Sequence, residues 1–116
     1  MSFKDTIFAL ATPQGRSAIA LFRISGKDSH NIVKKISSSK KTEINKPLLR
    51  IIHDQKKLAI DQTVITLFKS PKSFTGENMV EISCHGGMAV IKKISNTLLN
   101  SGTRMAEPGE FTRRAL

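Results

Sequence analysis

Apolar residues in this chain recur in short runs, and their spacing predicts strands interleaved with helices. Runs that are apolar throughout, or that alternate with polar residues, have the length and period of β-strands. Such runs occupy residues 6–11, 18–24, 47–53, 60–68 and 78–84. The polar segment 54–57, between the third and fourth runs, predicts a hairpin.

Two of these strands carry a charged side chain on a face that is otherwise apolar or weakly polar. Alternation with period two puts Arg23 on the same face as Ile19 and Leu21. It also puts Glu81 between Met79 and Ser83. The opposite faces of the two strands are suited to a core and consist of Ala18, Ala20, Phe22, Ile24, Val80, Ile82 and Cys84.

Two segments have the apolar period of amphipathic helices. The first follows Asp28 or Ser29 as N-cap, and the second covers residues 88–100, with Gly102 as C-terminal cap. Their apolar stripes are Ile32, Val33 and Ile36 in the first, and Val90, Ile91, Ile94, Leu98 and Leu99 in the second. A third helix is expected from Pro108, with Glu110 in its first turn and Phe111 and Leu116 as apolar positions.

The order of these elements predicts an α+β domain with a mixed β-sheet and two to three helices. A length of 116 residues suits one domain, so we assign residues 1–116 to a single unit. Because the last helix has just begun when the sequence ends, we expect the chain to be part of a longer protein. No apolar stretch approaches the ~20 residues that cross a bilayer, which indicates a cytoplasmic protein without membrane contact.

The chain is basic, with 19 Lys and Arg against 9 Asp and Glu and a formal net charge of +10. Lysine pairs recur at residues 34–35, 40–41, 56–57 and 92–93, and scattered lysines are typical of a solvated surface. The absence of Trp and Tyr argues against a platform that stacks bases. The charge alone permits weak, salt-sensitive attraction to phosphate backbones.

Common catalytic motifs are missing from the sequence. The segment 25–28 (SGKD) lacks the upstream glycine and the following Ser or Thr of a phosphate-binding loop. Cys84 is the only cysteine, which excludes an intramolecular disulfide and a zinc ribbon. Because Cys84 and His85 point to opposite faces of a strand, we expect a buried, apolar thiol rather than a nucleophile. His30 and His53 are isolated, so we expect neither a catalytic residue nor a metal site.

Arg23 and Glu81 are the residues for which a functional interpretation competes with a structural one. They could pair with each other, because a charge on a half-buried strand face needs a partner. Glu81 could also be an ordinary solvent-facing position. The functional alternative is a carboxylate that accepts paired hydrogen bonds from a flat, amino-substituted heterocycle.

Three stretches of sequence resemble one known family. TPQGRSAIALFRISG (12–26), SFTGENMVEISCHGG (73–87) and AEPGEFTRRAL (106–116) resemble, in order and spacing, the N-terminal domain of the MnmE (TrmE) family of tRNA modification GTPases. The resemblance covers essentially the whole chain and is weakest between residues 34 and 60. It departs from the family at residues 13–18 (PQGRSA), where a second proline and a glycine pair are common, but Arg16 is retained.

The resemblance implies a fold related to the tetrahydrofolate-binding domain of glycine-cleavage aminomethyltransferase. It implies a ligand, either 5-formyltetrahydrofolate or 5,10-methylenetetrahydrofolate, with the family's folate contacts at Arg23 and Glu81. A pterin offers a 2-amino group and a ring N–H, which a carboxylate can accept together. Arg16 and the loop of His85, Gly86 and Gly87 are further candidates for the folate pocket, although these glycines could equally form a plain turn between strand and helix.

The resemblance also implies a homodimer, and a larger enzyme that works with the FAD-dependent partner MnmG on tRNA. Together these proteins add a carboxymethylaminomethyl-type group to the wobble uridine of certain tRNAs. GTP, Mg²⁺ and K⁺ would bind only to a GTPase domain that this sequence lacks, so the chain alone is not expected to hydrolyse GTP. Two alternatives stay open: a stand-alone folate-dependent aminomethyltransferase, and a basic RNA-binding or assembly module without folate.

Overall fold

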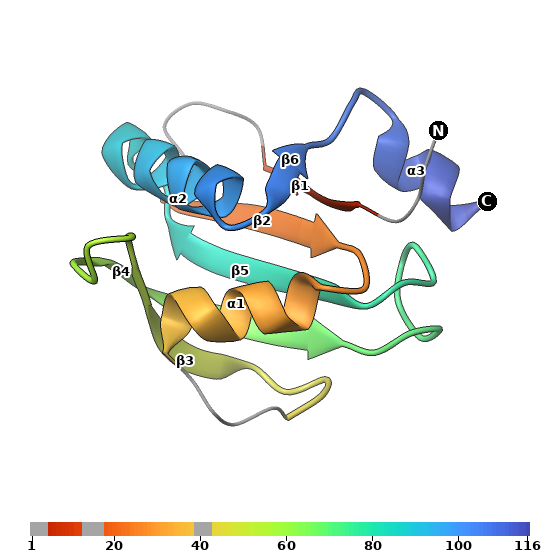
Figure 1. Cartoon of the computed structure of the whole chain (residues 1–116), viewed down its shortest axis with the longest axis horizontal. Coiled ribbons are helices and arrows are strands. Elements are labelled where there is room, and N and C mark those ends of the chain that lie inside the picture. Colours follow the sequence, from red (N-terminus) through yellow and green to blue (C-terminus); the bar gives the residue numbers. More distant parts are fainter. Residues whose placement is uncertain (1–4, 13–17, 39–42) are drawn as a thin grey trace.

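The computed structural model describes residues 5–12, 18–38 and 43–116. In this part of the chain six strands and three helices form one mixed sheet with helical cover, which confirms the predicted α+β class (Figure 1). The elements, in chain order, are β1 (Thr6–Leu10), β2 (Ile19–Ser25), α1 (Ser29–Ser37), β3 (Leu48–His53), β4 (Ala59–Phe68), β5 (Met79–His85), α2 (Met88–Asn100), β6 (Thr103–Met105) and α3 (Glu110–Ala115).

The strand order in the sheet is β3-β4-β5-β2-β1-β6. Neighbouring strands run antiparallel except β1 and β6, which are parallel. The predicted hairpin joins β3 to β4, and the Oδ1 atom of Asp54 accepts hydrogen bonds from the amides of Lys56 and Leu58 in its turn. Strand β6 was not predicted, because three residues are too few to reveal a period.

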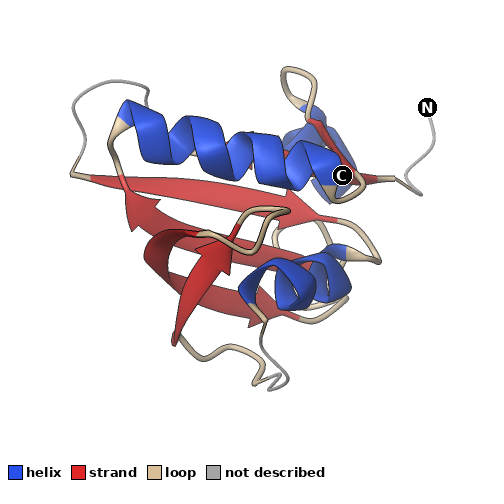
Figure 2. Cartoon of the chain, turned by 60° about the vertical axis from the view of Figure 1, so that its left-hand side comes forward, coloured by secondary structure: helices blue, strands red, loops and turns tan. Residues whose placement is uncertain are grey.

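The core lies between one face of the sheet and the two helices α1 and α2, the longer of which crosses the sheet in Figure 2. Of the core positions predicted on β2 and β5, six are buried, namely Ala20, Phe22, Ile24, Val80, Ile82 and Cys84. Ala18 was assigned wrongly, because it lies just before β2 begins and is exposed. The Phe8 and Phe22 rings pack with centroids 6.3 Å apart. One apolar position of α2 was assigned wrongly, since Leu99 lies beyond the edge of the buried stripe and is 46% exposed.

Helix ends differ from the prediction in two places. Asp28 occupies the N-cap position of α1 without a side-chain capping bond, and the Ser29 hydroxyl instead donates to the Asn78 carbonyl at 2.9 Å. Helix α3 begins at Glu110, directly after Gly109, whose φ of 76° is suited to glycine. Its buried residues are Glu110 and Arg114, not the apolar positions that the pattern predicted, because this helix docks through ion pairs.

The face of the sheet opposite α1 and α2 is called the open face here. Its central rows pair Arg23 with Glu81 and Leu21 with Ser83 across β2 and β5. Exposed apolar side chains flank these rows, namely Ile19, Leu49, Ile51 and Val64.

No helix of the described residues is long and apolar enough to cross a membrane.

Candidate functional site

Arg23 and Glu81 are brought together on the open face. They are direct partners in the β2–β5 register, and Nε of Arg23 donates to Oε2 of Glu81 at 3.0 Å. The Arg23 and Glu81 side chains are 39% and 29% exposed, respectively, so the pair is half-buried. The predicted pairing is therefore confirmed, and Glu81 is not a plain solvent-facing residue.

Phe74 adds an aromatic ring to this pair. The Arg23 guanidinium carbon lies 5.9 Å from the centroid of the ring, which is within cation–π range, and Phe74 is 55% exposed. Within the described residues, Oε1 of Glu81 accepts no hydrogen bond. The site thus combines a carboxylate oxygen available to a ligand, a cation that orients that carboxylate, and a solvent-facing ring.

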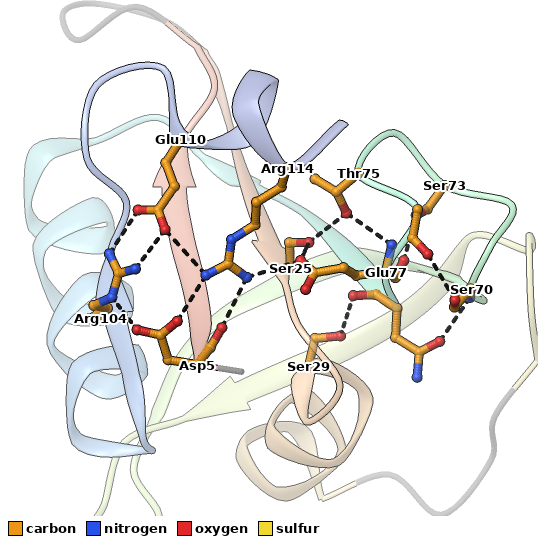
Figure 3. Close-up of polar contacts among 12 residues, drawn as sticks. Asp5, Ser25, Ser29, Ser70, Ser73, Thr75, Glu77, Arg104, Glu110 and Arg114 are labelled. Atoms are coloured by element: carbon orange, nitrogen blue, oxygen red, sulfur yellow. Dashed lines mark hydrogen bonds and ion pairs between the residues drawn. The ribbon is translucent and has the colours of Figure 1, made fainter. Parts of the chain in front are cut away.

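A hydrogen-bond network holds the loop that carries Phe74. Thr75 is buried, and its hydroxyl lies 2.7 Å from the hydroxyl of Ser25 at the end of β2 (Figure 3). Ser25 also donates to Oε1 of Glu77 at 2.8 Å, and Arg114 of α3 donates to the same oxygen at 3.0 Å. Residues from all three motif stretches therefore meet in one network next to the Arg23–Glu81 pair.

The same network continues into a cluster of charges at α3, in which Glu110 and Arg114 are buried while Asp5 and Arg104 are partly exposed. Arg104 makes a two-pronged contact with Glu110, at 2.7 and 2.6 Å, and Arg114 donates to Glu110 at 3.2 Å. Both arginines also contact the carboxylate of Asp5 (Figure 3). The hydrogen bonds from Arg104 lower the pKa of the Glu110 carboxyl to about 2 against the opposing effect of burial, so Glu110 stays ionised at neutral pH.

The second candidate segment, His85-Gly86-Gly87, lies at the end of β5. Asp61 of β4 orients His85, because its carboxylate accepts from the His85 amide at 2.9 Å and lies 2.7 Å from Nδ1 of the ring. Gly86 donates to the Ala18 carbonyl at 3.0 Å, and Gly87 is the N-cap residue of α2. A Cβ at Gly87 would meet nothing within 4 Å, so the chain's own packing does not require that glycine.

The sequence did not predict two parts of this site. These are Asp61 and the hydrogen-bond network of Ser25, Thr75, Glu77 and Arg114. Nothing in the alternation of residues 60–68 distinguishes Asp61, because its partner lies on another strand. Arg16, the remaining candidate, lies outside the described residues.

Cys84 and His30, two further titratable residues considered in the sequence, lie in surroundings typical of a structural role. Cys84 is buried in the core, and burial, with the nearby Asp61 charge as a smaller cause, raises the pKa of its thiol to about 11. The thiol is therefore protonated at neutral pH and unsuited to be a nucleophile, as predicted. His30 of α1 is not isolated, since its Nε2 lies 2.9 Å from the Phe68 carbonyl and 3.2 Å from the Met79 carbonyl.

Comparison with known proteins decides the family. The family model described as "GTP-binding protein TrmE N-terminus" matches residues 6–116. The chain belongs to this TrmE N-terminal family. It is 51% identical over 112 residues to the tRNA modification GTPase MnmE of Thermotoga maritima. The aligned region covers 96% of this chain and 25% of the relative. The MnmE proteins of Fervidobacterium nodosum and Malacoplasma penetrans are 50% and 46% identical, over 97% and 96% of the chain.

This TrmE-type chain spans about a quarter of the length of the relatives it matches. Their shared name describes a tRNA modification GTPase, and the region they share with this chain is the α+β domain described above. Membership confirms the family indicated by the three motif stretches. It leaves the ligand and the roles of Arg23 and Glu81 to be argued from the site.

Proposed function

We propose that this chain is the folate-binding and dimerisation domain of a tRNA-modifying GTPase. In the proposed enzyme this domain holds a one-carbon tetrahydrofolate while other domains bind GTP. With the FAD-dependent partner MnmG, the enzyme would add a carboxymethylaminomethyl-type group to the wobble uridine of certain tRNAs. Relatives named tRNA modification GTPase MnmE, at about half identity over nearly the whole chain, support this assignment.

The observation that carries the folate proposal is the Arg23–Glu81 pair beside Phe74. A pterin edge presents an amino group and a ring N–H side by side, and a carboxylate has enough lone pairs to accept both while one oxygen also accepts from Arg23. The Glu81 carboxylate is held in one orientation by Arg23, which reduces the entropy that binding must overcome. The ring of Phe74 lies beside the Arg23 guanidinium and is more than half exposed, so it offers an apolar surface to a flat ring.

The residues present therefore fit the head group of a folate. Bound 5-formyltetrahydrofolate or 5,10-methylenetetrahydrofolate would supply the one-carbon unit. Glu81 would fix the pterin edge, Arg23 would orient Glu81, and Phe74 would shield one side of the ring from water. The Ser25–Thr75–Glu77 network would keep Phe74 in place before the ligand arrives.

Replacement of Glu81 by Gln tests this proposal. The amide keeps the size of the side chain but loses the charge and one acceptor, so affinity for 5-formyltetrahydrofolate should fall by roughly a hundredfold or more. Isothermal titration calorimetry on the 116-residue chain measures the change. Ser83→Ala, two residues along the same strand face, is the matched control and should bind within about threefold of the unmodified chain. Equal affinity of the Gln variant and the unmodified chain would rule out Glu81 as the pterin contact.

The dimer is the second part of the proposal. The apolar side chains Ile19, Leu49, Ile51 and Val64 of the open face are exposed in the single chain, and a second copy would remove them from water. Light scattering at micromolar concentration should therefore report twice the mass of one chain. Ile51→Glu, which places a charge among these side chains, should shift the mass toward that of a monomer. A strict monomer for the unmodified chain would contradict the dimer.

A further inference from the structure

The two residues that helix α3 buries are both charged. Glu110 is fully buried and the Arg114 side chain is 1% exposed, whereas Phe111 is partly exposed and Leu116, directly after the helix, is fully exposed. A helix of six residues is not stable by itself in water, because its few hydrogen bonds do not offset the cost of nucleation. The position of α3 therefore depends on the ion pairs that dock it.

One of these ion pairs joins α3 to the loop between β4 and β5. Nη1 of Arg114 donates to Oε1 of Glu77 at 3.0 Å (Figure 3). The same oxygen accepts from the hydroxyl of Ser25, at the end of β2, at 2.8 Å. A single carboxylate oxygen thus connects α3, the loop and the end of a central strand.

The donors and acceptors along this connection can be assigned from α3 to Thr75. An ionised carboxylate only accepts, so Ser25 gives its one hydroxyl proton to Glu77. The Thr75 hydroxyl, 2.7 Å from the Ser25 oxygen, must then donate to Ser25, and its own oxygen accepts from the Glu77 amide at 3.2 Å. Ser25 and Thr75 are buried, and a buried hydroxyl without a partner costs free energy. The bonds therefore stabilise one another.

The far end of this chain of bonds lies at the candidate ligand site. Thr75 directly follows Phe74, whose ring centroid lies 5.9 Å from the guanidinium carbon of Arg23. Ser25 lies two residues after Arg23, on the same face of β2. A displacement of Thr75 would therefore move the Phe74 ring relative to Arg23 and change the apolar surface that a flat ligand meets.

We propose that α3 is a conformational switch for the ligand site at Arg23 and Glu81. With α3 docked, the bond from Arg114 to Glu77 keeps Phe74 in the position that receives a flat ring. When α3 is released, the loop loses this anchor and ligand affinity falls. Such coupling is reciprocal, so a bound ligand also favours the docked helix. The identity of the ligand rests on the proposed function, whereas the coupling of α3 to the loop does not.

Removal of the Arg114 guanidinium tests this inference. Arg114→Met keeps the aliphatic stem of the side chain but removes its bonds to three carboxylates. Affinity of the 116-residue chain for 5-formyltetrahydrofolate should fall by roughly tenfold. Amide hydrogen exchange should speed up in residues 70–78, whereas the hairpin of β3 and β4 should keep its exchange rates. Calorimetry and mass spectrometry measure the two effects, with circular dichroism to confirm the fold.

Arg113→Met is the matched control. Arg113 precedes Arg114 in the same helix, and its replacement changes the net charge by the same amount. Arg113 pairs with Glu107 and donates to the Pro108 carbonyl, both of which lie outside the loop. This variant should bind folate within about threefold of the unmodified chain and leave exchange in residues 70–78 unchanged. Equal weakening by the two variants would overturn the inference, because it would assign the effect to net charge.

Thr75→Val tests the route of the coupling. Valine has the shape of threonine without the hydroxyl, so the loop loses its bond to Ser25 while α3 keeps the pair of Arg114 with Glu77. If the effect of α3 passes through this bond, the double variant with Arg114→Met should bind within about twofold of the weaker single variant. Losses that multiply in the double variant would show two independent effects and overturn the inference.

The reciprocal effect can be measured without any substitution. Saturation of the unmodified chain with 5-formyltetrahydrofolate should slow amide exchange in residues 110–115 as well as in residues 70–78. Slower exchange in the loop alone would overturn the switch, even if Arg114→Met does not fold.

The same measurements separate this inference from the proposed function. Equal folate affinity of Arg114→Met and the unmodified chain would overturn the switch alone. A chain that binds no folate, but whose residues 70–78 exchange faster in Arg114→Met than in Arg113→Met, would overturn the folate proposal alone.

Discussion

Replacing Glu110 by Gln should lower the free energy of unfolding by about 3 kcal/mol at neutral pH, as a depression of the carboxyl pKa from its ordinary value of about 4.5 to about 2 implies. Glu110 is fully buried and accepts from both Arg104 and Arg114. The amide offers one acceptor oxygen and no charge, so Arg104 would keep Asp5 as a carboxylate partner, and Arg114 would keep Asp5 and Glu77. Urea denaturation followed by circular dichroism measures the loss.

The pH dependence gives the same carboxylate a second signature. Because the pKa of Glu110 is lower in the folded state than in the unfolded state, its stabilising contribution is complete above about pH 5 and is lost as the pH falls toward 2. The difference between the unmodified chain and the Gln variant should therefore shrink over that range. A difference that stays constant between pH 7 and pH 3 would contradict the assigned role of the charge.

Glu107→Gln is the control for this substitution. Glu107 lies three residues earlier, is largely exposed, and meets Arg113 at 3.5 Å. Exposed pairs of this kind contribute about 0–1 kcal/mol, so its removal should change stability by less than about 0.5 kcal/mol. A comparable loss in both variants would mean that overall charge, and not the buried cluster, controls the docking of α3.

The elements of this fold that were predicted correctly are those in which buried apolar residues recur at a regular spacing along the sequence. Strands β2 and β5 alternate over seven residues each, and Ile32, Val33 and Ile36 recur at helical spacing, so the core face could be read directly. Helix α3 could not be read in this way. Its six residues bury an acid and a base, and hydrophobic periodicity contains no information about a helix held by ion pairs.

The candidate site shows the same division. Arg23 and Glu81 stand out because each breaks an otherwise consistent strand face, and pairing of β2 with β5 explains why they meet. Phe74 and Thr75 lie in a loop without a period. Their positions depend on contacts to Ser25 and Arg23, which are about fifty residues away in the sequence. Such contacts follow from the order of the strands in the sheet and from the conformation of the loop. Neither can be predicted from the spacing of neighbouring residues in the sequence.

Charge distribution is a third case. Lysine pairs along the sequence suggested a diffuse, solvated surface. The lysines of these pairs that the structure describes are exposed, apart from the half-buried Lys34, which agrees with that prediction, whereas four arginines are held in ion pairs with carboxylates. Net charge is a property of composition, whereas a patch depends on which charges find partners.

Replacing Gly26 by Ala should destabilise the domain by about 3–4 kcal/mol, because the new methyl group has no space and the backbone is unsuited to it. Gly26 follows β2 at a φ of 145°, and a Cβ there would lie 2.6 Å from Oγ1 and 2.8 Å from Cα of Thr6. Thr6 belongs to β1 and cannot move away without disturbing the β1–β6 pairing. Thermal and urea denaturation measure the loss.

The control separates the clash from the unfavourable dihedral. Gly102 also has a positive φ, of 99°, but a Cβ there would meet no atom within 4 Å. Gly102→Ala should therefore cost only about 1 kcal/mol. Because Gly26 lies directly after Ser25, its substitution should also increase hydrogen exchange in the loop of Thr75 and Phe74, whose anchor is the Ser25 hydroxyl. Equal losses in the two alanine variants would show that strand β1 yields to the added methyl group, and that close packing at Gly26 does not fix the end of β2.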